Sequence, residues 1–175
     1  MATTKWTLDP AHSEIQFKVK HLMITNVTGT FSVVSASVEA DDDKFSKAKV
    51  SFTADPKSIT TNKEQRDGHL KTADFFETEK YPEIKFESSD FNASTGKIKG
   101  NLVIKGVSKP VTLDVEFHGT TKDPWGNEKA GFSLTGKIDR KDWGLNFNAA
   151  LETGGVLLSD EVKINAEIQI AKQAA

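Results

Sequence analysis

The stretch 66–76, RDGHLKTADFF, holds the side chains of this sequence that are best suited to chemistry. Arg66, Asp67, His69 and Asp74 lie close together, and two phenylalanines follow them. Asp67 with His69 would form an acid/base pair, because an imidazole and a carboxylate can exchange protons near neutral pH. The two phenylalanines instead favour burial, because they carry no polar tip. The stretch therefore has two interpretations, an active site or a lid over an apolar site.

Metal-dependent or nucleophilic chemistry has little support elsewhere in the chain. His12 and Glu14 have a spacing that suits a metal on one strand face, but no third ligand follows at a recognisable distance. The absence of cysteine excludes thiolate metal sites, disulfides and cysteine nucleophiles. No nucleotide-binding, zinc-protease or serine-hydrolase motif occurs. We therefore predict no catalytic residue, no metal ligand and no enzyme activity, and keep an enzyme that uses His12, His21 or His69 as an alternative.

Length and charge narrow the class of protein. The 175 residues predict one domain, residues 1–175. A net charge of −2, from 23 basic and 25 acidic residues, predicts no broad attraction to nucleic acid or to an anionic membrane. No stretch approaches the roughly 20 apolar residues that a membrane span needs. The polar start MATTKWTLDP predicts no signal peptide and a cytoplasmic chain, although a trimmed mature form of a periplasmic protein has the same appearance.

Apolar and polar residues alternate along most of the chain, which is typical of strands with one buried face. Ile15, Phe17 and Val19, for example, share one face of a strand. Short turn signals between such segments favour antiparallel hairpins. The predicted strands are 14–21, 27–40, 47–54, 83–91, 97–105, 110–119, 129–139 and 160–171. Within 27–40 the apolar phase slips by one residue, which predicts a β-bulge or a sharp bend.

One short helix is predicted after Thr61. The stretch TNKE at 61–64 matches a capping box, in which Thr61 accepts from the Glu64 amide. The helix would run to about residue 74, weakened by Gly68. One helix cannot cover eight one-sided strands, so the sheet must close into a barrel or fold into a sandwich, and the barrel is preferred.

Large and small residues share the predicted interior of this barrel. The inward phase carries phenylalanines at Phe17, Phe31, Phe52, Phe86, Phe117 and Phe132. It also carries small residues at Gly29, Ala48, Ala54, Gly100, Ala130, Gly136 and Ala166. Aromatic walls interrupted by missing side chains suit a ligand cavity. Alternatively, the glycines bend the strands and side chains fill the interior.

Two polar residues, His21 and Arg140, continue the inward phase at the ends of their strands. Because an unpaired buried charge is costly, both are expected near a barrel rim. One interpretation is a polar site for a ligand head group at the barrel mouth. The other is structural: His21 is a satisfied rim histidine, and Arg140 pairs with Asp9, Asp67 or Asp142 and holds a loop.

Four segments together resemble the YceI-like family, also described as polyisoprenoid-binding, lipocalin-like proteins. They are WTLDPAHSEIQFKVKHL (6–22), RDGHLKTADFFETEKYPEIKFES (66–88), GNLVIKGVSKPVTLDVEF (100–117) and IDRKDWGL (138–145). The resemblance implies an all-β fold with one short helix, an eight-stranded antiparallel lipocalin-like β-barrel. It implies a bound polyisoprenoid or quinone-like lipid instead of a cofactor, held for carriage, storage or sequestration, and a possible homodimer. A filled-core structural or stress-response interaction module is the alternative.

The residues expected to contact the lipid follow from strand phase and position. They are Phe17, Val19, His21, Phe31, Phe52, Arg66, His69, Leu70, Phe75, Phe76, Phe86, Leu102, Phe117, Phe132, Arg140 and Trp143. On a helix, Arg66, His69 and Leu70 share one face while Asp67 points elsewhere. The charged cluster in 66–76 therefore divides, and the stretch is interpreted as a lid, or a fixed plug, with polar rim residues that orient a ligand.

Overall fold

The computed structural model describes residues 3–148 and 157–173, and almost all of the regular structure is β-strand. The strands are β1 (Thr4–Leu8), β2 (Glu14–His21), β3 (Thr25–Phe31), β4 (Val34–Ala40), β5 (Ala48–Ala54), β6 (Ile59–Thr60), β7 (Ile84–Phe91), β8 (Lys97–Ile104), β9 (Val107–Lys122), β10 (Glu128–Asp139) and β11 (Leu158–Lys172). The helices are α1 (Glu64–Leu70) and the short 3₁₀ helices η1 (Pro10–His12), η2 (Pro56–Ser58), η3 (Ala93–Thr95) and η4 (Arg140–Trp143).

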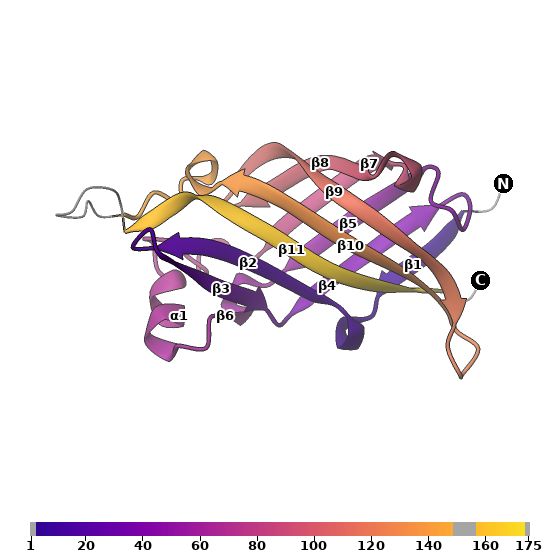
Figure 1. The fold of residues 1–175 in the computed structure, drawn as a ribbon, viewed down its shortest axis with the longest axis horizontal. Helices are drawn as coiled ribbons and strands as arrows, with labels where there is room; N and C mark the ends of the chain where they lie inside the picture. Colours follow the sequence, from indigo (N-terminus) through magenta and orange to yellow (C-terminus); the bar gives the residue numbers. More distant parts are fainter. Residues whose placement is uncertain (1–2, 149–156, 174–175) are drawn as a thin grey trace.

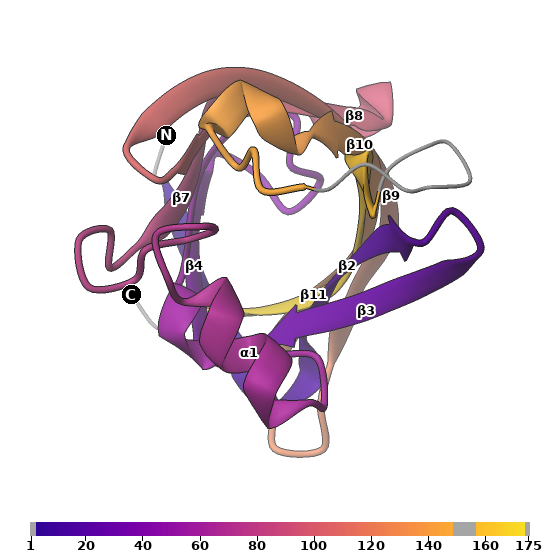
Figure 2. The ribbon, with the colours of Figure 1, turned by 90° about the vertical axis from the view of Figure 1, so that its left-hand side faces the viewer.

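The sheet closes into an eight-stranded antiparallel barrel, which confirms the predicted fold class (Figures 1 and 2). The ring runs β1-β4-β5-β7-β8-β9-β10-β11, and β11 pairs back with β1. Beyond β1, the same edge of β11 pairs with β2. The sheet then continues through β3 and ends at β6, so the strand order opens at this end of the barrel. Helix α1 follows β6 and lies beside that opening (Figure 2).

The predicted slip within 27–40 is confirmed as a bend. Ser32 and Val33 separate β3 from β4, so one predicted strand becomes two that pair with different partners, β2 and β1. β1 itself was missed, because five residues with two apolar side chains give little periodicity. The bend between β3 and β4 and the break after β1 let β2 and β3 extend the sheet beyond the closed ring.

An aromatic plug closes the barrel at the end away from α1. It consists of Trp6, Phe45, Phe91, Phe117 and Phe132. Trp6 and Phe45 are fully buried, with ring centroids 5.2 Å apart. Phe132 stacks on Phe117 with centroids 5.0 Å apart. Edge-to-face and stacked pairs of this kind stabilise a core beyond the area that they bury.

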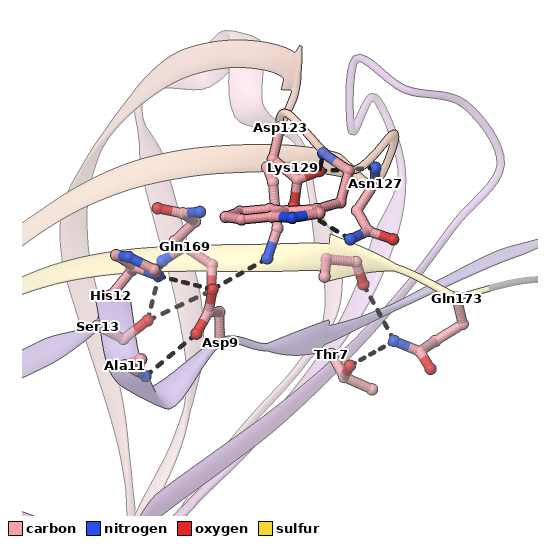
Figure 3. A network of polar contacts seen from close by, with 12 residues as sticks. Thr7, Asp9, Ala11, His12, Ser13, Asp123, Asn127, Lys129, Gln169 and Gln173 are labelled. Carbon is pink, nitrogen blue, oxygen red and sulfur yellow. Dashed lines mark hydrogen bonds and ion pairs between the residues drawn. The ribbon is translucent and has the colours of Figure 1, made fainter.

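A polar network on one side of the plug end ties separate elements together (Figure 3). Asp9 accepts from the His12 Nδ1 and from the Lys129 Nζ, each at 2.9 Å, and so joins η1 to β10. These hydrogen bonds, to His12 first and then to Lys129, lower the pKa of Asp9 to about 2. Ser13 accepts from the Gln169 amide at 3.0 Å and fixes the start of β2 against β11.

Helix α1 is shorter than predicted, and its N-terminus is built differently. It ends at Leu70, and the predicted capping box is wrong: within the described residues, no side chain caps the helix at Lys63. Both the amide and the hydroxyl of Thr61 instead donate to Asp67, at 2.8 and 2.5 Å. Asp67 lies one turn further along and reaches back to the loop, which is a stronger charge-assisted contact.

Candidate ligand-binding cavity

An elongated apolar cavity of about 420 Å³ runs along the barrel axis. Inward side chains of β2–β5 and β7–β11 form its wall. On β11 alone the wall extends from Leu158 at the α1 end to Ile170 beside the plug. Twelve residues of strand correspond to roughly 40 Å, or roughly 30 Å along the axis of a tilted barrel. The cavity therefore has the shape of a blind tunnel whose floor is the aromatic plug.

The structure places the predicted contact residues on this wall, with two exceptions. The residues that line the cavity are Phe17, Val19, His21, Phe31, Phe52, Arg66, His69, Leu70, Phe75, Phe76, Phe86, Leu102, Phe132 and Arg140. Strand phase was sufficient for most of them, because a closed barrel turns one face of every strand inward. Ligand contact itself stays a prediction for all of these residues.

Phe117 and Trp143 were expected on the wall and lie elsewhere. Phe117 belongs to the plug, where its ring packs between Phe45 and Phe132, with the register shift between Gly131 and Phe132 nearby. Trp143 is buried in η4, and its indole Nε1 donates to the Leu102 carbonyl at 2.9 Å. A buried indole needs such a partner, so Trp143 fixes η4 against β8.

Phe147 is the most informative residue that sequence reasoning missed. Its ring lies 4.9 Å from His69 and 5.2 Å from Phe75, so it joins the cluster over the α1 end of the cavity. Leu145, also on the wall, precedes it by two residues. The alternation in GLNFN at 144–148 was the available signal. It follows η4 and belongs to no described strand, so a search for strands passed over it.

The glycines in the inward phase act differently from either expectation. A Cβ on Gly29 would lie 2.2 Å from the Phe17 ring, and one on Gly100 would lie 2.7 Å from the Phe86 ring. Neighbouring rings therefore occupy the spaces that these glycines leave. The glycines let the large rings lie along the wall, and the cavity remains in front of them.

Arg140 lines the cavity but is held by backbone carbonyls. It is buried, its Nε donates to the Ser159 carbonyl at 2.9 Å, and its Nη1 donates to the Leu145 carbonyl. Burial lowers the pKa of Arg140, and the charges of Asp160 and Asp139 oppose that shift. The expected pairing with Asp9, Asp67 or Asp142 is wrong for the described residues. Arg140 does hold a loop, but by joining the segment after η4 to the start of β11.

The other charged residues on the wall lie at the α1 end, where the two phenylalanines of 66–76 also point inward. Arg66 donates to the Thr61 hydroxyl and carbonyl, both at 2.7 Å. His69 contacts Asp74 through Nε2 at 2.8 Å. Because Asp67 is bonded to Thr61, the suggested Asp67–His69 acid/base pair does not form among the described contacts. The geometry agrees with a polar rim around an apolar mouth.

Comparison with known proteins agrees with this architecture. A family model described as YceI-like domain matches residues 6–170. The chain belongs to the YceI-like family. A UPF0312 protein of Staphylococcus aureus (strain N315) is 43% identical over 169 residues, which cover 96% of this chain and 98% of the relative. A crystal structure of the Campylobacter jejuni YceI protein has 36% identity and a TM-score of 0.74, and the match covers 89% of this chain and 90% of that one.

One solved member of the fold has a ligand class in its description. A polyisoprenoid binding domain from Saccharophagus degradans superposes with a TM-score of 0.69, covering 96% of this chain and 98% of that one. At 17% identity this likeness shows the shared fold alone. The same fold thus occurs in the solved proteins from Campylobacter jejuni and Saccharophagus degradans.

The described part of this YceI-like barrel shows no candidate metal site. No three His, Cys, Asp or Glu side chains gather there in a metal-binding arrangement. His12 lies in η1 and pairs with Asp9, so its expected place on a strand face beside Glu14 is wrong. Among the described residues, no helix is long and apolar enough to cross a bilayer. The absence of a metal and of catalysis stays a prediction.

Proposed function

We propose that this YceI-like chain binds a long-chain amphiphile, a polyisoprenoid or quinone-like lipid, and carries, stores or sequesters it. The observation that supports the proposal is the blind apolar tunnel, whose polar wall residues Arg66 and His69 lie on α1, His21 at the end of β2 and Arg140 in η4. A lipid would enter tail first and leave its polar group at the rim. The polyisoprenoid-binding description of the Saccharophagus degradans domain fits the same ligand class.

The energetics favour a ligand selected by its tail. Each buried CH₂ contributes about 0.8 kcal/mol. Ordering a flexible chain offsets part of that gain. The cavity presents almost no polar surface, because apolar side chains form nearly all of its wall. Affinity is therefore expected to rise with chain length until the tail reaches the aromatic plug, and to depend weakly on any one polar contact.

The cavity weighs against the filled-core alternative, which requires an interior without a continuous tunnel. The direct test is mass spectrometry of an organic extract from purified protein. We expect a co-purified isoprenoid-type or other long-chain amphiphile. An empty extract, together with no uptake of long-chain alcohols or isoprenoids by the purified protein, would refute the proposal.

A further inference from the structure

The tip of the β2–β3 hairpin is apolar and exposed, which is unusual for a tight turn. Five large apolar side chains are exposed among the described residues: Leu22, Met23, Ile24, Val33 and Trp125. Three of the five are consecutive at this tip, with exposed fractions of 40%, 54% and 78%. Single exposed apolar residues are ordinary, but a contiguous group marks an interaction surface.

The backbone of the turn makes these residue types costly. Leu22 and Met23 have φ angles of 52° and 63°, and the Ile24 amide donates to the His21 carbonyl at 3.2 Å. This β-turn lies inside a three-residue loop between the paired residues His21 and Thr25, and both of its central residues are in the left-handed region, where Asn and Gly are strongly preferred. Leu and Met satisfy no requirement of the turn itself, so a contact outside the barrel explains their presence better than local folding does.

The tip adjoins the α1 end of the cavity. The Leu22 amide donates to the Leu157 carbonyl at 2.9 Å, and Leu157 lies on the cavity wall. His21, the residue before the turn, also lies on the wall. Apolar surface therefore continues from the inside of the tunnel to the outside of the barrel. A lipid tail needs such a continuous surface to move from a membrane into the tunnel without crossing water.

Lysines on the outer wall complement the apolar tip. Lys163 lies directly opposite Lys18 on one side and Lys137 on the other, and like charges in such positions destabilise a sheet. Lys18, Lys20 and Lys163 form no ion pair with any described residue. Lys20 is two residues, or roughly 7 Å, from the tip, which is within the screening length of about 10 Å at ordinary salt.

Two acidic residues near the start of β11 lie in ion pairs. Asp160 pairs with Lys141 at 3.3 Å, and Glu161 lies 4.0 Å from Lys137. Asp139 caps η4 by accepting from the Lys141 amide at 3.0 Å. Lys18, Lys20 and Lys163 therefore leave unpaired positive charge on β2 and the adjacent β11, the strands beside the hairpin.

We propose that the hairpin tip Leu22–Ile24 inserts into the surface of an anionic lipid bilayer, with the adjacent lysines on the phosphates, and so places the cavity mouth on the membrane. The docking proposal rests on the proposed function, because its purpose is the exchange of lipid between the membrane and the cavity. A second copy of the chain is the competing occupant. A two-fold contact through this tip would bring two sets of unpaired lysines together, whereas a bilayer supplies the opposite charge.

The test compares a hairpin variant with a control at the opposite end of the barrel. Met23→Asn with Ile24→Thr removes apolar surface and places Asn where the turn prefers it, so folding is retained. Trp125→Ser removes a side chain that is 82% exposed on the β9–β10 turn. Co-sedimentation uses phosphatidylcholine vesicles with and without phosphatidylglycerol. We expect partitioning onto the vesicles to fall at least about tenfold for the hairpin variant. For Lys20→Gln it should fall about fivefold, and on the anionic vesicles alone. Trp125→Ser should partition like the parent chain.

A second measurement separates docking from cavity binding. Parinaric acid added from ethanol reports on the cavity, and parinaric acid loaded in vesicles reports on transfer from a membrane. The hairpin variant should bind parinaric acid from ethanol like the parent chain, but take it up from vesicles more slowly. Equal vesicle binding by the hairpin variant and the parent chain would overturn the docking. So would light scattering that shows a dimer which the hairpin variant dissociates. If the parent chain takes up no parinaric acid by either route, the proposed function fails, and the vesicle partitioning still decides the docking.

Discussion

A charge placed in the middle of the tunnel provides the sharpest test of where the lipid tail lies. Phe52 projects inward from β5, between Ala36 on β4 and Phe86 on β7, and lies on the cavity wall. Phe52→Asp replaces part of that wall with a carboxylate. In the empty cavity water can solvate the charge, but a lipid tail would displace that water and leave the carboxylate without a partner.

The expected loss follows from the cost of desolvating that charge. The effective penalty for one uncompensated ion in a protein interior is several kcal/mol. Even about 3 kcal/mol would weaken lipid binding by more than roughly 100-fold. Desolvation also raises the pKa of the introduced carboxyl in the lipid-bound state above its ordinary value of about 3.9. The neutral acid therefore binds better, and affinity should recover by up to about tenfold for each unit by which the pH falls.

The assay is titration of the purified variant with a fluorescent long-chain amphiphile over a range of pH. Phe52→Leu controls for loss of the ring. Thr53→Asp controls for the charge, because Thr53 is the next residue on β5, on the opposite face, and lies across from Lys85. Circular dichroism melts establish that each variant is folded. Identical affinities for folded Phe52→Asp and Phe52→Leu, with no dependence on pH, would show that the tail does not pass Phe52.

Three further predictions concern stability and are read from thermal melts. Gly100→Val should lower the melting temperature by about 3–10 °C through overpacking worth about 1–3 kcal/mol, because its Cβ would lie 2.4 Å from a backbone carbonyl. Gly68→Ala, with open space around it, should stabilise the fold by up to about 1 kcal/mol. Equal changes in the melting temperatures of the two variants would contradict the close packing around Gly100. Phe45→Ala should cost about 3–5 kcal/mol by leaving a hole in the plug, and a neutral result would show that the plug is dispensable. Asp9 has a folded-state pKa lowered from 3.8 to about 2, so its contribution is present above pH 3.8 and lost as the pH falls towards 2. Asp9→Asn should therefore melt below the parent chain near neutral pH and approach it in acid, whereas a constant difference would refute the linkage.

The sequence predicts the wall of the barrel well, because alternation is a local property. Ile15, Phe17 and Val19 reveal their common face without any knowledge of the partner strands. The phase slip near Ser32 likewise predicted the bend between β3 and β4. The number of one-sided strands, with one helix to cover them, left a barrel or a sandwich as the two possible folds and favoured the barrel.

Side-chain contacts that depend on how loops fold were outside the reach of that reasoning. The capping box at Thr61 was a sound local pattern, and Asp67 displaced it by a stronger contact. Arg140 found its partners in the carbonyls of Leu145 and Ser159 instead of an aspartate. Phe147 carried no strand signal and still reached the cavity mouth.

The sequence by itself determined which face of each strand turns inward, and it favoured a barrel over a sandwich. The tertiary structure alone decided that the interior is a tunnel with one closed end, because the plug brings together Trp6, Phe45 and Phe132, which are far apart in the chain. It also decided that Gly29 and Gly100 make room for neighbouring rings and not for a ligand. Periodicity records the side of a strand on which a residue lies, whereas a cavity depends on how side chains from opposite walls fill the space between them.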